Sequence, residues 1–350
     1  MGTEGYVVSY SSSMRGITFN EIERRIGKIT IVSEGSNSAA IASLDFANMT
    51  KKLIDERLIF ARHIHPYFVE AKLSGNLQDL LVIKEQCNKI LTKLCWEEVY
   101  VCQCRIDSSI EYGFRNRDLT QKLIEYFKGK GVQVSADKAS MAISLSIIDD
   151  KVYLGISFLE DNLSRWTGGV LFYAKDTSVI CRAELKLEEA IEYFDIKLKD
   201  VKNAIDLGAA PGGWSHYLAL RGIQVDAVDP ASLSQRLSTE KKIRHYKMTA
   251  QEFSRKHAAK SYDLLVDDMK MDTQMSTKIV CGLTEHLKDN GSIILTLKLP
   301  KNGVWKRIYE SVSLLREYFT DIKVRQLFYN RSEVTIYAKK RTEFVKRNNK

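Results

Sequence analysis

The chain has 350 residues, which is enough for two or three compact domains and a sizeable core. Its 53 Lys and Arg residues outnumber 44 Asp and Glu residues, and the net charge of +9 favours a polyanionic partner, although such a balance is also common on soluble surfaces. No run approaches the roughly 18 apolar residues of a membrane span, and the first residues lack a basic stretch followed by an apolar one. We therefore expect a cytosolic protein with no membrane contact.

The first 158 residues show the pattern of two small α+β domains. Residues 5–46 alternate short apolar stretches with a helix-like segment at 19–25. After them, the spacing predicts a helix over 80–94, a strand over 99–104, a helix over 119–127, and strands over 141–148 and 151–158 joined at Asp149-Asp150. We place domains at 1–58 and 59–158, and a linker at 159–177 around Gly168-Gly169.

Neither cysteines nor histidines are arranged as a metal site. The six cysteines show no C-x-x-C spacing, and the valines at 99 and 101 indicate a strand around Cys102 and Cys104. His63 and His65 have no third ligand nearby, so we interpret them as ordinary strand or loop residues. The sequence thus predicts reduced thiols and no metal.

The order of elements in 59–158, with basic loops, resembles the end of a THUMP domain. THUMP domains are RNA-binding modules, so the resemblance implies an RNA partner; the alternative is an unrelated α+β domain. Six basic residues would then contact phosphates: Arg105, Arg115, Arg117, Lys122, Lys128 and Lys130.

A glycine-rich turn at 203–215, NAIDLGAAPGGWS, organises the second half of the chain. An apolar run ends in Asp206, and Gly208, Gly212 and Gly213 allow positive φ angles and a close approach to a ligand. Asp229 closes the next apolar run, where an acid can accept hydrogen bonds from a ribose diol. Neither G-x-G-x-x-G nor a P-loop is present. The turn therefore indicates a nucleotide-type cofactor site, with an ordinary α/β turn as the alternative.

Further strands are predicted at 245–248, 262–268 and 291–298, and helical patterns at 278–287 and 304–319. Two strands, 321–329 and 333–339, are joined by Asn330-Arg331-Ser332, which is short enough for an antiparallel hairpin. Parallel strands followed by an antiparallel pair are typical of the Rossmann-like S-adenosylmethionine-dependent methyltransferases. We assign this domain to 178–340 and a basic tail to 341–350, which could touch phosphate but which we interpret as solvated.

Within this domain, residues 206–215 resemble the cofactor loop of the FtsJ-type ribose 2'-O-methyltransferases, whose catalytic set is Lys-Asp-Lys-Glu. The segment R-A-E-L-K-L at 182–187 is similar to a helix of that family. The segment V-D-D-M at 266–269 is similar to the end of one of its strands. The lysine of L-K-L-P at 297–300 and the glutamate of S-E-V at 332–334 complete the set. The resemblance implies that the catalytic residues are Lys186, Asp268, Lys298 and Glu333.

Among these enzymes, the chain most resembles the RlmM group, which carry a THUMP domain and methylate a cytidine ribose in 23S ribosomal RNA. The shared stretches include K-L-E-E-A at 186–190 and R-S-E-V-T at 331–335. The resemblance implies S-adenosylmethionine as cofactor, held by Cys181, Asp206, Ala210, Pro211, Gly212, Gly213, Trp214, Asp229, Thr249 and Asp268. Thr249 stands where an acid usually contacts adenine, and Cys181 where the RlmM group has a serine.

The implied chemistry explains why such a set is needed. A ribose 2'-hydroxyl is a poor nucleophile at neutral pH, so a base must take its proton during the attack on a methyl group. Lys298 is our candidate base, because Lys186 and the positive sulfur of the cofactor would favour its neutral form. Asp268 and Glu333 would hold the two lysines in place.

We therefore predict an α/β RNA ribose 2'-O-methyltransferase that follows a THUMP-type region and acts on 23S ribosomal RNA. One alternative is the same chemistry on transfer RNA, since THUMP domains occur in enzymes for both. The other is an RNA-binding or ribosome-assembly protein that keeps the cofactor fold without turnover. A base methyltransferase is disfavoured, because no Asn-Pro-Pro-Tyr-type motif or catalytic cysteine follows the fourth strand. The sequence leaves the oligomeric state open.

Overall fold

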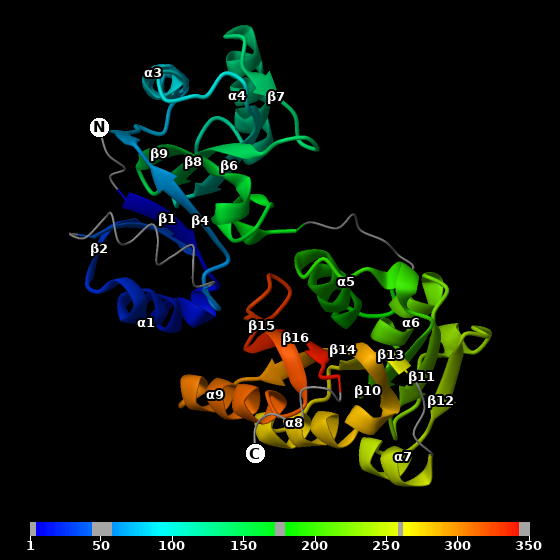
Figure 1. The fold of residues 1–350 in the computed structure, drawn as a ribbon. Coiled ribbons are helices and arrows are strands. Elements are labelled where there is room, and N and C mark those ends of the chain that lie inside the picture. The colour runs from blue at the N-terminus through cyan, green and yellow to red at the C-terminus, as the bar shows by residue number, and fades with distance from the viewer. Residues whose placement is uncertain (1–4, 44–57, 172–178, 258–261, 343–350) are drawn as a thin grey trace. The chain divides into compact units, whose positions relative to one another are not determined.

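The computed structural model describes residues 5–43, 58–171, 179–257 and 262–342 (Figure 1). Contacts divide the chain into two compact units, Met1–Leu171 and Phe172–Lys350, called here the first and second units. Within the described ranges, no helix is both long enough and apolar enough to cross a membrane.

The first unit begins with an antiparallel sheet in the order β2-β3-β1-β4. Its strands are β1 (Gly5–Ser9), β2 (Ile29–Glu34), β3 (Ser38–Ser43) and β4 (His63–Tyr67), and helix α1 (Arg15–Ile26) packs its apolar face on them. The predicted boundary at residue 58 does not match this sheet. β4 lies beyond that boundary but pairs with β1 along its whole length, because it satisfies the backbone groups on the open side of β1.

A second sheet of the first unit has the order β5-β9-β8-β6-β7. It is built from β5 (Val69–Lys72), β6 (Val99–Asp107), β7 (Gln133–Val134), β8 (Met141–Ile148) and β9 (Lys151–Phe158), with helices α3 (Asp79–Leu91) and α4 (Asn116–Gly129). The predicted helices and strands of this region are confirmed, including the turn at Asp149-Asp150 between β8 and β9.

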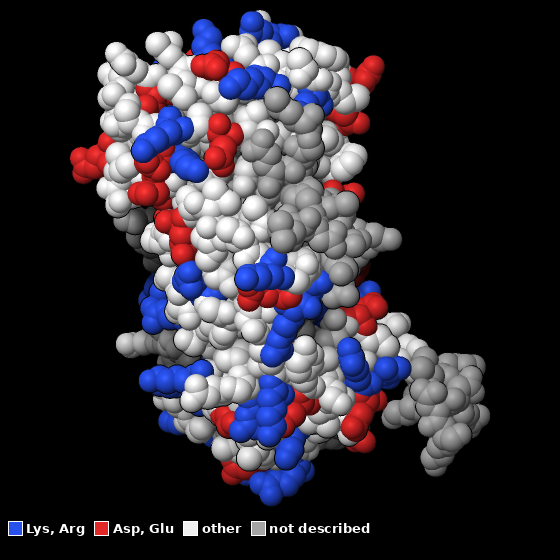
Figure 2. All heavy atoms as spheres, turned by 90° about the vertical axis from the view of Figure 1, so that its left-hand side faces the viewer, with Lys and Arg blue, Asp and Glu red and all other residues white. Residues whose placement is uncertain are grey.

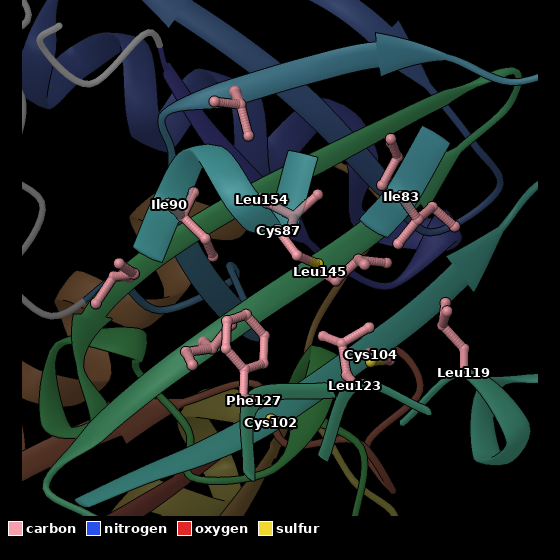
Figure 3. Close-up of a cluster of buried hydrophobic side chains, with 14 of the residues drawn as sticks. Ile83, Cys87, Ile90, Cys102, Cys104, Leu119, Leu123, Phe127, Leu145 and Leu154 are labelled. Atoms are coloured by element: carbon pink, nitrogen blue, oxygen red, sulfur yellow. The ribbon is translucent and has the colours of Figure 1, made fainter. Parts of the chain in front are cut away.

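Helices α3 and α4 pack on this second sheet through a buried apolar cluster (Figure 3). Cys87 of α3 and Cys102 and Cys104 of β6 belong to this cluster and are at most 6% exposed. Burial raises the pKa of Cys87 and Cys104 to about 12, so both thiols stay protonated at neutral pH. These cysteines therefore serve as small apolar groups of the core.

The first part of the predicted linker at 159–177 belongs to the first unit instead. Two short helical turns, Leu159–Asn162 and Thr167–Gly169, pack within the first unit. Ser9 Oγ donates to the Gly168 carbonyl at 2.9 Å, and Gln103 Nε2 donates to the Arg165 carbonyl at 2.9 Å. These bonds attach the segment to β1 and β6, and residues 172–177 of the predicted linker lie outside the described residues.

The second unit contains a sheet in the order β12-β11-β10-β13-β14-β16-β15. Its strands are β10 (Asn203–Leu207), β11 (Gln224–Val228), β12 (Ile243–Tyr246), β13 (Tyr262–Asp267), β14 (Leu287–Lys298), β15 (Phe319–Arg325) and β16 (Glu333–Lys340). Neighbours from β12 to β14 are parallel, whereas β16 runs antiparallel to both β14 and β15. The predicted Rossmann-like arrangement is confirmed.

Helices cover both faces of this sheet. Figure 1 shows α5 (Ala183–Tyr193) and α6 (Gly213–Leu220) on one side, and α8 (Thr273–Gly282) and α9 (Val304–Leu315) on the other. Helix α7 (Ala250–Lys256) follows β12. The core beneath α5 and α6 includes Leu187, Trp214, Leu218, Val266 and Ile294. Since the strands β10 to β14 are parallel, their carboxyl ends form a common edge.

Several predicted boundaries in the second unit are wrong. β12 ends at Tyr246 rather than residue 248, because Thr249 caps α7 and draws the chain out of the sheet. Helix α8 begins at Thr273 rather than 278, since the Asp272 carboxylate accepts hydrogen bonds from the backbone of Gln274 and Met275. The connection between β15 and β16 spans residues 326–332, not three residues. From residue 343, the predicted basic tail lies outside the described residues.

Candidate active site

The turn between β10 and α6, called here the glycine loop (Gly208–Gly213), is closely packed. Gly208 and Gly212 have φ angles of +70° and +109°, which favour glycine. A Cβ atom on Gly208 would lie 2.7 Å from Met269 Cγ, and one on Gly213 would lie 2.6 Å from Cys181 Sγ. The loop thus places backbone at the carboxyl end of β10 beside Cys181, one of the predicted cofactor residues, with Ala210 half-buried and Pro211 exposed.

Two acids flank the glycine loop in different ways. Asp206 is 1% exposed and accepts a hydrogen bond from Ser215 Oγ at 2.6 Å, and burial raises its pKa to about 7. Asp229 follows β11 and accepts hydrogen bonds from the amides of Ala210 at 3.0 Å and Ala231 at 2.7 Å. Asp206 is therefore a buried anchor of α6, while each Asp229 oxygen keeps a lone pair for a further donor.

Trp214 and Thr249 make structural contacts that the sequence pattern did not predict. Trp214 is 3% exposed, and its Nε1 donates to the Ala183 carbonyl at 2.6 Å, which joins α6 to the start of α5. Thr249 Oγ1 accepts a hydrogen bond from the Glu252 amide, while the Glu252 carboxylate accepts one from the Thr249 amide. Thr249 is thus the N-cap of α7, in a capping box.

The four predicted catalytic residues come from four different elements. Lys186 lies on α5, Asp268 directly follows β13, Lys298 ends β14 and Glu333 begins β16. Lys298 and Glu333 are register partners of the antiparallel pair β14 and β16, and β13 is the parallel neighbour of β14. The sheet therefore brings three of the residues to one edge, and α5 adds the fourth above it.

These four side chains, called here the charged cluster, form a continuous set of ion pairs. Lys186 Nζ lies 3.3 Å from Asp268 Oδ2 and contacts Glu333 Oε1. Lys298 Nζ contacts Asp268 Oδ1 and lies 3.8 Å from Glu333 Oε2. The side chains of Lys186, Asp268 and Glu333 are 11 to 15% exposed, whereas that of Lys298 is 26% exposed. Each cation thus faces two carboxylates, and Lys298 is the most accessible member.

Charge keeps Lys186 protonated in spite of its burial. Burial by itself lowers the pKa of the Lys186 ammonium, but the nearby Asp268 and Glu333 carboxylates outweigh it and raise this pKa above its ordinary value. Lys186 is therefore a fixed cation at neutral pH. Its positive charge lies between two acids that would otherwise repel each other.

A cleft of about 670 Å³ opens over the charged cluster. Its wall includes Arg182, Lys270, Tyr329 and Arg331, of which the three cations are exposed at the surface. The sequence analysis did not name Lys270 or Tyr329, and it included Arg331 only in the stretch 331–335 without a role in the site. Their positions next to Asp268 and Glu333 are the signal that could have identified them.

Acids buried behind the cleft hold its walls in place. The Asp267 carboxylate accepts hydrogen bonds from the Met269 amide at 2.7 Å and from Ser276 Oγ at 2.5 Å, and burial raises its pKa to about 7. The Glu189 carboxylate of α5 accepts hydrogen bonds from the amides of Phe328 and Tyr329 at 2.7 and 2.8 Å. Asp267 fixes the chain at Asp268, and Glu189 fixes the loop before Glu333.

Comparisons with known proteins relate part of the second unit to methyltransferases. A family model described as FtsJ-like methyltransferase matches residues 179–306, which include Lys186, Asp268 and Lys298 but not Glu333. A ribosomal RNA large subunit methyltransferase M from Colwellia psychrerythraea is 30% identical over 241 residues, or 64% of this chain. That match spans 61% of the Colwellia protein. A protein of the same name from a Shewanella species is 24% identical, over 91% of this chain and 92% of its own length.

Among solved structures, TrmN from Thermus thermophilus is 12% identical, with a TM-score of 0.38. The match covers 96% of this chain and 99% of TrmN. In the described part of the chain, no group of three or more His, Cys, Asp and Glu side chains is placed to hold a metal ion.

Proposed function

We propose that this chain, whose residues 179–306 form an FtsJ-like methyltransferase domain, is an enzyme that methylates a ribose 2'-hydroxyl of RNA with S-adenosylmethionine as methyl donor. The observation that carries the proposal is the charged cluster. Two lysines and two carboxylates meet at the carboxyl edge of the sheet, within the cleft and next to the strand that leads into the glycine loop. Such an arrangement suits proton removal from a hydroxyl group better than binding alone.

The residues around the glycine loop fit the cofactor. The partly exposed backbone at Ala210 and Pro211, the remaining lone pairs of Asp229 and the neighbouring Cys181 offer donors and acceptors for its amino-acid and ribose parts. Asp206, Trp214 and Thr249 support the site indirectly, by holding neighbouring segments in place, because their polar groups already form hydrogen bonds within the protein. When bound, S-adenosylmethionine supplies an electrophilic methyl group.

Within the charged cluster, we assign different roles to the two lysines. Lys298 first releases its ammonium proton to solvent through the cleft and then, as a neutral amine, accepts the proton of the 2'-hydroxyl, since it is the most exposed member and reaches one of its two carboxylates only at 3.8 Å. Lys186 keeps its proton and offsets the charge of Asp268 and Glu333. Asp268 contacts both lysines and orients Lys298 toward the cleft. Proton transfer of this kind contributes roughly 10² to 10⁴ in rate.

We further propose that the first unit includes a THUMP-type domain that binds RNA in the cytosol. Five of the six basic residues predicted to contact phosphate are exposed, on or next to α4: Arg115, Arg117, Lys122, Lys128 and Lys130. The sixth, Arg105, packs against Gly168, where an added Cβ would lie 2.0 Å from its Nη1. Arg105 is therefore a structural residue rather than a phosphate ligand.

Large-subunit ribosomal RNA is the proposed substrate, in line with the names of the relatives, and a cytidine ribose in 23S RNA is the proposed target. The test is transfer of labelled methyl from S-adenosylmethionine to ribosomal RNA and, separately, transfer RNA from cells that lack the protein. Nucleoside analysis after digestion should reveal a 2'-O-methylated nucleoside from ribosomal RNA. Lys298→Ala should reduce this transfer by about 10² or more and leave cofactor affinity within a few-fold.

Lys256→Ala is the matched control, because it removes an exposed lysine on α7 of the same unit. Label found only in transfer RNA would keep the chemistry and change the substrate. Cofactor binding with no transfer to either RNA would favour the non-catalytic RNA-binding alternative. Full activity of Lys298→Ala would remove Lys298 as the base.

A further inference from the structure

Helix α9 carries two aromatic side chains outside its inward face. Its inward face buries Val304, Ile308, Ser311 and Leu315 against the rest of the unit. Trp305 and Tyr309 lie one turn apart on another face, with ring centroids 6.0 Å apart and planes inclined by 29°. Tyr309 is 62% exposed, although a tyrosine buries most of its ring when it serves a core.

The surroundings of this aromatic pair are basic. The Lys306 side chain is 78% exposed and that of Arg307 is 36% exposed, and Lys301 is exposed just before the helix. The Glu310 carboxylate pairs with both cations: its Oε1 lies 3.9 Å from Lys306 Nζ and its Oε2 lies 3.4 Å from Arg307 Nη1. Figure 2, which views the side of the second unit that carries α9, shows many Lys and Arg side chains there, interspersed with Asp and Glu. An aromatic pair with several nearby cations complements a polyanion that has planar groups.

Helix α9 is linked to the cleft of the charged cluster through α8. Thr273, the first residue of α8, donates a hydrogen bond from Oγ1 to the Lys298 carbonyl. Its neighbour Gln274 donates from Nε2 to Glu310 Oε2, and Glu310 is adjacent to Tyr309. Along the chain, Leu299 lines the cleft and α9 begins at Val304. A strand of RNA that entered the cleft would therefore pass within reach of α9.

We propose that Trp305 and Tyr309 form a stacking platform for unpaired RNA bases that flank the nucleotide in the cleft. A base that packs on the exposed face of Tyr309 extends the Trp305–Tyr309 stack. The ammonium groups of Lys306 and Lys301 then contact the adjoining phosphates. Bases in a duplex already stack on each other, so the platform selects a single-stranded segment without reading its sequence. This inference rests on the proposed function, because it assumes that RNA occupies the cleft.

The test measures RNA binding by fluorescence anisotropy, with the full chain and without cofactor, so that it does not depend on turnover. A labelled single strand and a duplex of equal length are compared at fixed salt. The Trp305→Ala/Tyr309→Ala double variant should bind the single strand about 10-fold more weakly or worse, with little change for the duplex. Trp305→Phe/Tyr309→Phe should retain affinity, because stacking needs only the rings.

Leu220→Ala is the control for loss of exposed apolar surface, since Leu220 of α6 is 61% exposed. Circular dichroism and cofactor titration check that each variant is folded. An equal loss for single strand and duplex, or none for either, overturns the platform. The platform is also overturned if light scattering shows that the double variant is monomeric where the unmodified chain is dimeric, while RNA affinity is unchanged. In that case the surface binds a second copy of this chain. Ring-dependent binding without methyl transfer would support the platform and defeat the proposed function.

Discussion

The two units bury ionisable side chains with opposite effects on pH dependence. In the first unit, His65 is 2% exposed, and burial lowers its pKa to about 4. In the second, Asp206 and Asp267 are at most 1% exposed, and burial raises the pKa of each to about 7. In both units, burial favours the uncharged form. The histidine should therefore destabilise the fold at acid pH, and the aspartates at alkaline pH.

The charged cluster differs from both of these regions. Its members are less deeply buried, opposite charges lie within 4 Å of one another, and Lys186 gains rather than loses affinity for its proton. Maintaining four charges in a recessed site costs desolvation energy, which a neutral network such as that of His65 avoids. Paired charge at this edge is thus a feature that the fold alone does not require, which is why we assign the chemistry to it.

The largest expected effect follows from removing the fixed cation. Lys186→Met leaves Asp268 and Glu333 facing each other without an intervening charge, and we expect kcat/KM for methyl transfer to fall by about 100-fold. Cofactor affinity should change by no more than a few-fold. Lys197→Met serves as control, because the side chain of Lys197 is 62% exposed and belongs to the same unit.

A double-mutant cycle sharpens this test. Glu333→Gln alone should also slow transfer, but Lys186→Met/Glu333→Gln should lose less than the sum of the two single effects, since each variant removes the same ion pair. Strict additivity would mean that the two residues act independently and that the cluster does not function as a unit.

A smaller effect is expected for the stability of the second unit between pH 5 and 8. A raised carboxyl pKa means that the folded state holds the proton of Asp267 above pH 4, where the unfolded chain releases it. The resulting stabilisation is present at low pH and is lost as pH rises through about 7, by roughly 2 to 3 kcal/mol. Asp267→Asn, which can keep the bonds to Met269 and Ser276, should flatten this decline in urea unfolding. An unchanged slope would place the titration elsewhere.

Local pattern was sufficient to predict most of the fold, whereas the members of the charged cluster were predicted from the resemblance to a known family. Strands β8 and β9 match their predicted ranges because alternating apolar residues and the turn at Asp149-Asp150 act within a few residues. The four cluster residues were predicted from short motifs, and the register of β14 with β16 explains why distant motifs meet.

What the sequence did not predict depends on contacts between distant segments. β4 joins β1 across 50 or more residues, and no local signal shows which sheet a short strand will enter. The buried role of Trp214 depends on the Ala183 carbonyl, and the position of Tyr329 depends on Glu189 of α5. Asp267 and Asp268 look equivalent in sequence, but the alternation of a strand turns one inward and the other toward the cleft.

The smallest expected effect is the acid response of the first unit, which should oppose that of Asp267. The ring of His65 bonds to Ser146 Oγ at 2.8 Å and to the Pro66 carbonyl at 2.9 Å, and His63 lies 5.9 Å away between ring centroids. Because its pKa falls to about 4 on folding, the unfolded chain takes up a proton first as pH falls from 6.5. Stability should then drop by about 2 kcal/mol between pH 7 and 4.5. His65→Gln should remove this drop in thermal unfolding, whereas Asp267→Asn should leave it intact; a drop that persists in His65→Gln would show that another group in the first unit titrates.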